Sequence, residues 1–562
     1  MIDEIRSAPL LDGVRGGVPV DRDELVDLLL RIGGENGLLV DCEDYIAELD
    51  LNPIIAGPDG LCAVDARVLL AAQDARRPAF APVTDLRPLL EPRNVAVAGA
   101  SASRITPGNL FIDNLRAFGF QGGIYPIHPS ADRIQGLQAY ARLDQVPEPV
   151  DYAYLAVAAE QCEPLIAAGA GRVAFAQVMS GGFAERAGGE ALEQALLDSA
   201  RAGAVRLLGP NTMGAYSPRG HLSYIGGFEQ EPGGVSVLSQ SGGLCTDIVR
   251  RGARRGLRFR CVLSLGNSAD VGAAELLPGL LADEQTRVIG LYLEDPHRGR
   301  ELLQQLTAAR GRKPVVLLVG GQTEQGNRAA SSHTGALAGD GRAWQALARQ
   351  VEAPLTGTLD EFIDVLLAMQ TLRPRAGRVT RDVVLFGNGG GTSVLAADAF
   401  GREGLAVRAL PDETRAALEA LSLPAGASVA NPIDVPANVL QREEGAIARR
   451  IVAAVFAGAS LDAFVIHVNV PVILNYAHVD ILGNLMEATL QAASGGERSG
   501  HVVLVLRSDG EPEMEAQRGA MAERARAAGI PVYFELVEAA RALAGFAVHE
   551  AALARVQHQR SR

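Results

Sequence analysis

Short apolar runs alternate along most of the chain with amphipathic segments of helix length. The apolar runs are rich in Val, Ile, Leu and Ala, and many end in glycine, asparagine, serine or proline. Continuous apolar runs of this kind are typical of strands that are covered on both faces, as in parallel sheets. The pattern therefore predicts an α/β protein throughout.

Three stretches interrupt the alternation and are expected to be linkers, since they are rich in proline, glycine and polar residues: 76–94, 216–234 and 371–381. They predict four blocks: 1–75, 90–215, 230–371 and 380–555. The last two blocks look like two versions of one architecture.

Composition narrows the class of protein. The chain has 562 residues, of which 48% are hydrophobic, and a net charge of 52 − 66 = −14. This acidic balance argues against nucleic acid or anionic membrane surfaces as general partners. The five cysteines form no CxxC pair, and no long apolar segment or signal peptide is evident, so we expect a cytoplasmic protein.

Lysine is nearly absent from the chain. Lys313 is the only one among the 52 basic residues, and the sequence contains no GxxxxGK[ST] motif. Schiff-base catalysis and a P-loop are therefore not expected.

A first candidate site follows the expected strand Val95–Ala98, where the sequence continues with Gly99, Ala100 and Ser101. A tight turn between a strand and a helix can present backbone N–H groups to a phosphate. The same glycine could equally serve only the geometry of the turn.

A sharper candidate lies in GVSVLSQSGGLCTDIVRRG (234–252), where a strand should end near Leu238. Ser241, Gly242 and Gly243 would then open a helix with free amides and the positive end of its dipole exposed, which is a seat for an anion. The alternative is an ordinary serine N-cap with glycines for close packing.

The stretch SSHTGALAGD (331–340) places His333 among small residues. It ends the segment 314–340, whose long Gly/Ala/Ser-rich part has no apolar periodicity and is expected to be a loop. A neutral imidazole can attack phosphorus and carry a phosphoryl group. A carboxylate would fix its tautomer, and Glu294, at the end of an expected strand, is the candidate. The alternative is an unremarkable loop histidine.

Several motifs together resemble the α subunit of NDP-forming acyl-CoA synthetases, the superfamily of succinyl-CoA synthetase and ADP-forming acetate–CoA ligase. In chain order they are GASASRITPGN, YPIHPS, LLGPNTMG, LSQSGG, SLGNSADV, YLED and SSHTGALAGD. The resemblance implies a Rossmann-like CoA-binding domain followed by two flavodoxin-like ligase domains.

The resemblance also implies residue roles. His333 would carry the phosphate and Glu294 would pair with it. The phosphoryl group would be bound by the openings of two helices, at Ser241, Gly242 and Gly243 and at Gly389, Gly390 and Gly391. CoA would contact Gly99, Ser101, Pro126, His128, Pro129 and Asn211.

One departure concerns Thr212, which stands where many relatives of this superfamily have a cysteine. The reacting thiol belongs to CoA, so catalysis does not obviously require a cysteine there.

The first block resembles the C-terminal part of an ATP-grasp domain, in which an asparagine and an aspartate hold Mg²⁺; here Asn52 and Asp65 match. Oxygen ligands suit this hard cation; the alternative is a turn and a solvated aspartate. About 75 residues are too few for a whole ATP-grasp domain, so we expect an ATP-grasp subunit or a missing upstream segment, in a homo- or hetero-oligomer.

The resemblance thus implies an acid–thiol ligase that makes acyl-CoA from an acid, CoA and ATP, through an acyl phosphate and phosphohistidine. Three alternatives remain: a subunit inactive without an ATP-grasp partner, an acyl-CoA sensor, and a ligase coupled to a lyase step. The sequence leaves open which acid is used, and whether ATP or GTP.

Four other residues are expected to carry no chemistry. Trp344 should pack in a helix, and His467 should be a strand histidine with satisfied hydrogen bonds. His549 and His558, near the C-terminus, should be solvated.

Overall fold

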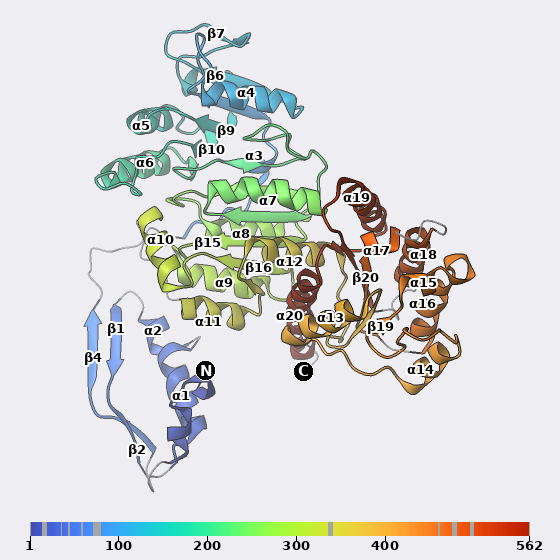
Figure 1. Ribbon diagram of the computed structural model, residues 1–562. Coiled ribbons are helices and arrows are strands. Elements are labelled where there is room, and N and C mark those ends of the chain that lie inside the picture. Colours follow the sequence, from blue (N-terminus) through green and yellow to red (C-terminus); the bar gives the residue numbers. More distant parts are fainter. Residues whose placement is uncertain are drawn as a thin grey trace. The chain divides into compact units, whose positions relative to one another are not determined.

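The computed structural model describes two units of the chain, residues 1–80 and 81–562 (Figure 1). The residues described are 2–13, 19–34, 36–42, 45–57, 60–70, 80–334, 341–458, 461–474, 480–494 and 500–560.

The N-terminal unit is a small α+β fragment. Its helices are α1 (Arg22–Gly33) and α2 (Leu38–Asp41), and its strands are β1 (Ile46–Leu51), β2 (Ile54–Gly57), β3 (Gly60–Ala63) and β4 (Ala66–Leu70). Strands β1 and β4 pair antiparallel, as do β2 and β3. Asp21 caps α1 by accepting from two backbone amides, but no residue of α1 is buried.

The second unit begins with a five-stranded parallel sheet of order β11-β10-β9-β5-β6. Its strands are β5 (Asn94–Ala98), β6 (Gly123–Ile127), β9 (Val150–Leu155), β10 (Val173–Val178) and β11 (Arg206–Leu208), and its helices are α3 (Arg87–Leu90), α4 (Pro107–Ala117), α5 (Ala159–Ala168) and α6 (Glu190–Ala202). A two-stranded hairpin, β7 (Arg133–Ile134) and β8 (Leu137–Gln138), follows β6.

The next sheet has the order β12-β14-β13-β15-β16-β17, and only β12 is antiparallel. The strands are β12 (Ala215–Tyr216), β13 (Val235–Ser239), β14 (Phe259–Ser264), β15 (Val288–Leu293), β16 (Val315–Val319) and β17 (Leu355–Thr356). The helices are α7 (Gly242–Arg255), α8 (Ala273–Ala282), α9 (Gly299–Ala309), α10 (Glu324–Thr334), α11 (Gly341–Val351) and α12 (Leu359–Thr371).

The last sheet is parallel, with the order β19-β18-β20-β21-β22. Its strands are β18 (Val383–Gly387), β19 (Ile433–Asp434), β20 (Ala463–Asn469), β21 (His501–Arg507) and β22 (Val532–Tyr533). Its helices are α13 (Gly390–Arg402), α14 (Asp412–Glu419), α15 (Ala437–Leu440), α16 (Ile447–Gly458), α17 (Val470–Leu474), α18 (Ile481–Ala493), α19 (Pro512–Ala527) and α20 (Leu536–Arg560).

The three parallel sheets share one topology. Counted in chain order, and leaving out β12, each has the spatial order 2-1-3-4-5, which is the flavodoxin-like order. The predicted α/β class is therefore confirmed, as is the likeness between the last two blocks. In this order ligands bind beyond the carboxyl ends of the first and third strands, where the winding direction changes.

Apolar packing joins the last two sheets. One buried cluster contains Val237 and Val262 of the middle sheet, Val465 and Val503 of the last sheet, and Phe362 of α12. Helices α12 and α20 lie side by side between the two sheets (Figure 1). The last sheet has a second core on its other face, around Phe386, Phe464 and Ile466.

The one lysine has a structural role. The Lys313 ammonium donates to the backbone oxygens of Leu280 and Asp283, at 2.8 and 2.6 Å, and these carbonyls lie at the C-terminal end of α8. A cation at this end of a helix satisfies carbonyls that have no partner within the helix.

Candidate functional site

The helix that was expected to open at Ser241 does so in the structure. Ser241 is the N-cap of α7, and its hydroxyl accepts from the Leu244 amide at 3.4 Å. Its own amide donates to the Ser239 hydroxyl at 3.1 Å. Gly242 needs its missing side chain, because a Cβ atom would lie 2.6 Å from Met213 Cγ. The α7 opening therefore presents backbone rather than side chain.

Glu294 lies at the same edge of the sheet, directly after β15. Strands β13 and β15 are neighbours, and Ser239 pairs with Tyr292 in register. The Gln240 side chain joins the two loops: its oxygen accepts from the Glu294 amide at 2.6 Å and the Asp295 amide at 3.0 Å, and its nitrogen donates to the Asp295 carbonyl at 2.9 Å. Gln240, which the sequence analysis missed, fixes Glu294 beside α7.

The Glu294 carboxylate is nearly buried, with 9% of the residue exposed. The Tyr292 hydroxyl donates to it at 2.8 Å. Burial, and then the Glu294 carboxylate, raises the pKa of Tyr292 well above its usual value, so the hydroxyl keeps its proton. A Cβ atom at Gly320, after β16, would lie 3.1 Å from Glu294 Cγ, so glycine there leaves room for the carboxylate.

His333 lies in the last turn of α10, and its side chain is outside the described residues. The expectation of a loop is wrong for residues 324–334, which are helical; the Thr323 hydroxyl accepts from the Gly326 amide at 3.0 Å and favours the helix start. Residues 335–340 lie outside the described residues.

The segment that carries His333 begins and ends at this sheet edge. Gly320 and Gln322 follow β16, and Gly341, at the start of α11, packs against Gln322, whose backbone oxygen lies 2.4 Å from the position of a Cβ atom at Gly341. The segment is thus anchored next to Glu294. Cys245, in the first turn of α7, is no rival nucleophile, because burial raises the pKa of its thiol to about 12.

The first candidate turn lies at the corresponding place in the preceding sheet. Gly99 follows β5 with φ +96, and a Cβ atom there would lie 2.1 Å from the Ala156 carbonyl oxygen. Only glycine fits this turn. The Ser101 amide donates to the Asn109 side chain at 2.9 Å, and its hydroxyl accepts from the Ser103 amide at 3.2 Å.

His128 lies near Gly99, because the residues just before them, Ile127 and Ala98, pair in register. His128 Nδ1 accepts from the amides of Ser130 and Ala131, at 3.2 and 3.0 Å. The ring is therefore protonated on Nε2, which is left as a donor.

The two prolines of the YPIHPS motif, Pro126 and Pro129, lie in different environments. Pro126 is a buried residue of β6, not a loop residue; β6 is an edge strand, where a residue without an N–H is tolerated. Pro129 is exposed just after the strand.

Asn211 lies where loops of the first and middle sheets meet, and its amide donates to the Ser180 carbonyl at 3.0 Å. Its loop follows β11, and Pro210 accepts from the Asn267 amide at 2.9 Å across to the middle sheet. The neighbouring Thr212 hydroxyl donates to the Ser264 carbonyl and accepts from the Gly214 amide at 3.1 Å, so this hydroxyl holds the loop in place.

Gly389, Gly390 and Gly391 form the opening of α13, at the corresponding place in the last sheet. The Asp434 side chain accepts from the Gly389 amide at 2.7 Å, and burial raises the pKa of this carboxyl group. A Cβ atom at Gly391 would meet nothing within 4 Å, so the first turn is open to a ligand.

Two histidines differ from expectation. His467 is a strand residue with 1% exposure, but neither ring nitrogen has a hydrogen-bond partner among the described residues, so the expectation of satisfied hydrogen bonds is wrong. His549 lies on the face of α20 that packs near the end of α9 and the end of α11, and it is buried rather than solvated; His558, further along α20, is exposed. Trp344 packs in α11 with 4% exposure, as predicted.

Asn52 and Asp65 are brought together by the pairing of β1 with β4. The Asn52 amide donates to the Asp65 carbonyl at 3.2 Å, and both side chains are exposed. Among the described residues no group of three or more His, Cys, Asp or Glu side chains could hold a metal ion. Asn52 and Asp65 fit Mg²⁺ only as part of a larger oxygen set.

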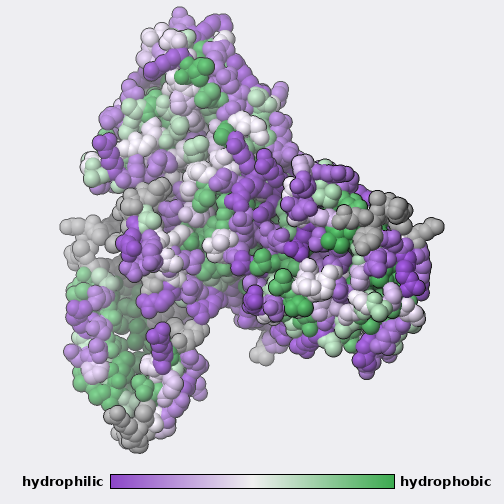
Figure 2. Space-filling view, viewed as in Figure 1, coloured by the Kyte–Doolittle hydropathy of each residue, from purple (hydrophilic) through white to green (hydrophobic). Residues whose placement is uncertain are grey.

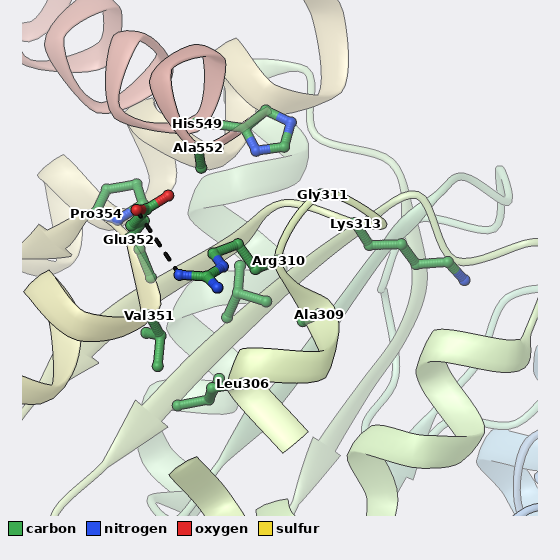
Figure 3. Close-up of a pocket in the computed structure, with 12 residues that line it drawn as sticks. Leu306, Ala309, Arg310, Gly311, Lys313, Val351, Glu352, Pro354, His549 and Ala552 are labelled. Atoms are coloured by element: carbon green, nitrogen blue, oxygen red, sulfur yellow. Dashed lines mark ion pairs between the residues drawn. The ribbon is translucent and has the colours of Figure 1, made fainter. Parts of the chain in front are cut away.

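The pocket in Figure 3 lies away from these turns. It is lined by residues that precede β16, by the end of α11 and by α20, and the Arg310–Glu352 ion pair crosses it at 3.8 Å. Its volume of about 20 Å³ suits one water molecule rather than CoA or a nucleotide. The described part of the chain contains no helix long and apolar enough to cross a membrane.

Three family models match the chain in succession. They are an ATP-grasp domain at residues 1–70, a CoA binding domain at 93–218 and a succinyl-CoA ligase-like flavodoxin domain at 232–369.

Curated relatives agree with these matches. ADP-forming acetate–CoA ligase II of Archaeoglobus fulgidus is 33% identical over 446 residues, 77% of this chain and 63% of that protein. The α subunit of the corresponding Pyrococcus furiosus ligase is 32% identical over 62% of this chain and 75% of the subunit. Its β subunit is 43% identical over 72 residues, which cover 12% of this chain and 29% of the subunit.

A solved structure extends the similarity. Acetyl-coenzyme A synthetase 1 of Ca. Korarchaeum cryptofilum, in complex with phosphate and ADP, superposes with a TM-score of 0.72 at 28% identity, over 85% of this chain and 99% of that one. The fold and these relatives place the chain in the class of acid–CoA ligase-like proteins. The chain belongs to the family of ADP-forming acyl-CoA synthetases.

Proposed function

We propose that this chain carries out the CoA and phosphoryl-transfer steps of reversible acyl-CoA synthesis: carboxylic acid, CoA and ATP give acyl-CoA, ADP and phosphate. The observation that carries the proposal is the shared sheet edge, where the capped opening of α7, Glu294 and the anchors of the His333 segment lie next to one another.

In the reverse direction, from acyl-CoA to ATP, the reaction divides into three balanced exchanges. Acyl-CoA and phosphate give acyl phosphate and CoA. The acyl phosphate transfers its phosphoryl group to the His333 imidazole and releases the acid. The phosphohistidine then transfers the group to ADP. Glu294 would orient the imidazole and stabilise its charged forms, and the α7 amides would stabilise the moving phosphoryl group.

CoA would bind across the first parallel sheet. Gly99 lets the nucleotide approach the backbone after β5, and the Ser101 turn and the His128 Nε2–H group supply donors at the same edge. Asn211 would act at the other end of the cofactor, toward the middle sheet, since its loop contacts the turn at Asn267. Pro129 would line the path, while Pro126 supports it from within β6.

Nucleotide handling would need the rest of an ATP-grasp domain, as a partner subunit or as further chain. Among the described residues 2–70, Ala8 is the only buried apolar side chain, and apolar residues are exposed on α1 (Val26, Leu29, Leu30) and β4 (Val68, Leu69, Leu70). Figure 2 shows apolar surface on this unit. Such a fragment is too small to bury a core by itself.

Asn52 and Asp65 would then supply two of the oxygen ligands that hold Mg²⁺ on the nucleotide phosphates. The ion would neutralise phosphate charge during transfer to or from the nucleotide.

The exchange of acyl-CoA and phosphate for acyl phosphate and CoA tests the proposal, because it needs no ATP-grasp partner. The full chain is incubated with acetyl-CoA or another acyl-CoA and inorganic phosphate, and acyl phosphate is trapped with hydroxylamine. Phosphate-dependent release of CoA with matching hydroxamate supports the proposal. No hydroxamate across a panel of acyl-CoA esters, from a chain that binds CoA, would overturn it.

A further inference from the structure

A histidine and an aspartate form a pair directly after Glu294. His297 Nδ1 lies 3.1 Å from Asp295 Oδ2, and the His297 amide donates to Asp295 Oδ1 at 3.0 Å. His297 has φ +54, in the left-handed region, so the chain turns tightly and brings the ring beside the Asp295 carboxylate. The steps in which Glu294 and His333 take part do not use this pair.

The pair is oriented for proton transfer. The Gln240 side chain holds the Asp295 backbone through its amide, at 3.0 Å, and its carbonyl, at 2.9 Å. The Asp295 carboxylate fixes the proton of the neutral ring on His297 Nδ1, which leaves Nε2 as an acceptor. Since 45% of the His297 side chain is exposed, a ligand can reach the ring. A carboxylate that orients an imidazole in this way is typical of a general base.

His297 lies where the first and middle sheets meet. Asn267, after β14, donates through Nδ2 to the Glu193 carboxylate of α6 at 3.2 Å. The Glu193 carboxylate is also close enough to His297 to raise the pKa of the imidazole. The Asn267 amide donates to the Pro210 carbonyl at 2.9 Å, next to Asn211. The imidazole therefore lies near the loop that would contact the reactive end of CoA.

Three carboxylates keep the imidazole basic. The hydrogen bond to Asp295 raises the pKa of His297 above its ordinary value of 6.5, against the effect of burial, and the charges of Asp295, Glu275 of α8 and Glu193 add to the rise. Arg298, the next residue, is paired with Glu275 at 3.0 Å. A raised pKa brings the imidazole closer to a thiol, whose pKa is about 8.5, and so favours proton transfer between them.

The CoA thiol needs such a base. At neutral pH only a few per cent of a thiol with a pKa of about 8.5 is thiolate, which is the nucleophile. Thr212, in the same loop as Asn211, does not serve, because its hydroxyl donates to the Ser264 carbonyl. Glu294 accepts from the Tyr292 hydroxyl and would pair with His333.

We propose that His297 is the general base for the CoA thiol and that Asp295 orients it; this role rests on the proposed function. In synthesis the thiol proton passes to His297 Nε2 as sulfur bonds to the acyl carbon, and the bond from this carbon to the phosphate oxygen breaks. In the reverse direction phosphate attacks the acyl carbon, and the imidazolium returns the proton to the departing sulfur. His297 thus acts only in the exchange that involves CoA.

The test compares two reactions of the full chain without nucleotide. One is release of CoA from acetyl-CoA and phosphate; the other is transfer of the phosphoryl group from acetyl phosphate to His333, which involves no thiol and is followed by mass spectrometry. His297→Asn keeps a residue that tolerates a left-handed backbone. It should slow the first reaction at least tenfold and leave the rate of the second within about twofold, which also shows that the variant is folded.

His221→Asn is the matched control. His221 is also a turn histidine with positive φ, +51, and its Nδ1 lies 3.0 Å from the carbonyl oxygen of Phe118, at the C-terminal end of α4. This variant should keep both rates.

The pH dependence gives a second readout. Release of CoA from acetyl-CoA uses the protonated imidazole, so kcat/KM should fall as the pH rises through the pKa of His297. Asp295→Asn removes the charge that contributes most to the raised pKa, so the midpoint of this fall should move to lower pH. An unmoved midpoint would contradict the pairing of Asp295 with the base.

Two results with His297→Asn would overturn the proposal. Equal slowing of both reactions would show that His297 only supports Glu294, and unchanged rates would show that it takes no part. A wild-type chain that performs neither reaction would instead contradict the proposed function, and this inference would fail with it.

Discussion

At the scale of the residue, burial decides which histidines can change charge. Burial lowers the pKa of His549 to about 4 from an ordinary value of 6.5. The folded chain therefore keeps this ring neutral, while the unfolded chain takes up a proton as the pH falls below 6.5. The stabilisation is present above pH 6.5 and is lost as the pH falls toward 4, by about 3 kcal/mol at about 1.36 kcal/mol per pH unit.

His549→Leu should remove that dependence. Between pH 7 and pH 4 the free energy of unfolding of the variant should fall by about 3 kcal/mol less than that of the wild type. Denaturant unfolding at several pH values measures this. His558→Leu, an exposed position on the same helix, should follow the wild type. If the free energies of unfolding of His549→Leu and the wild type fall equally with pH, the lowered pKa of His549 is contradicted.

A glycine provides the second test at this scale. Gly99→Ala should weaken CoA binding at least tenfold, because the added Cβ atom would clash with the Ala156 carbonyl oxygen and shift the turn. Gly171→Ala is the control: it has φ +68 but nothing within 4 Å of the added atom, so it should cost only about 1 kcal/mol of stability. Calorimetry with CoA compares the two; equal CoA affinity in both variants would count against a CoA site at Gly99.

At the scale of the element, a comparison of two helix caps distinguishes an effect on stability from an effect on the reaction. Ser241 caps α7 and Thr358 caps α12, each by accepting from a backbone amide of the first turn. Replacing either residue with alanine should cost about 1 kcal/mol of stability. Only Ser241→Ala should also slow CoA release from acyl-CoA and phosphate, by about tenfold, because it alters the anion seat. Equal rates of CoA release in the two variants would show that the anion does not bind at the opening of α7.

Strand and turn positions could be predicted from the sequence better than side-chain contacts. The expected strands before Gly99 and Ser241 occur as β5 and β13, since a buried parallel strand followed by a glycine turn is a local pattern. Gln240 and Asn388 were not recognised as the residues that join two loops, because their partners lie 54 and 81 positions away. The helical α10 was missed because serine and glycine suggested a loop.

At the scale of the whole molecule, the proposed chemistry lies in the second unit. Gly99, Ser241, Glu294 and His333 all belong to residues 81–562, whereas Asn52 and Asp65 belong to the first unit. A chain of residues 81–562 should therefore retain the acyl-CoA and phosphate half-reaction at a rate within a few-fold of the full chain. Loss of this half-reaction in a folded truncated chain would show that the first unit takes part in it.

The central claim is that His333 carries a phosphoryl group, and tandem mass spectrometry tests it most directly. The full chain is incubated with acetyl phosphate, or with acyl-CoA and phosphate, without nucleotide and without acid, and then analysed intact and after digestion. We predict one phosphoryl adduct on His333, and none in His333→Ala. An adduct on another residue, or none despite demonstrated CoA binding, would contradict the account.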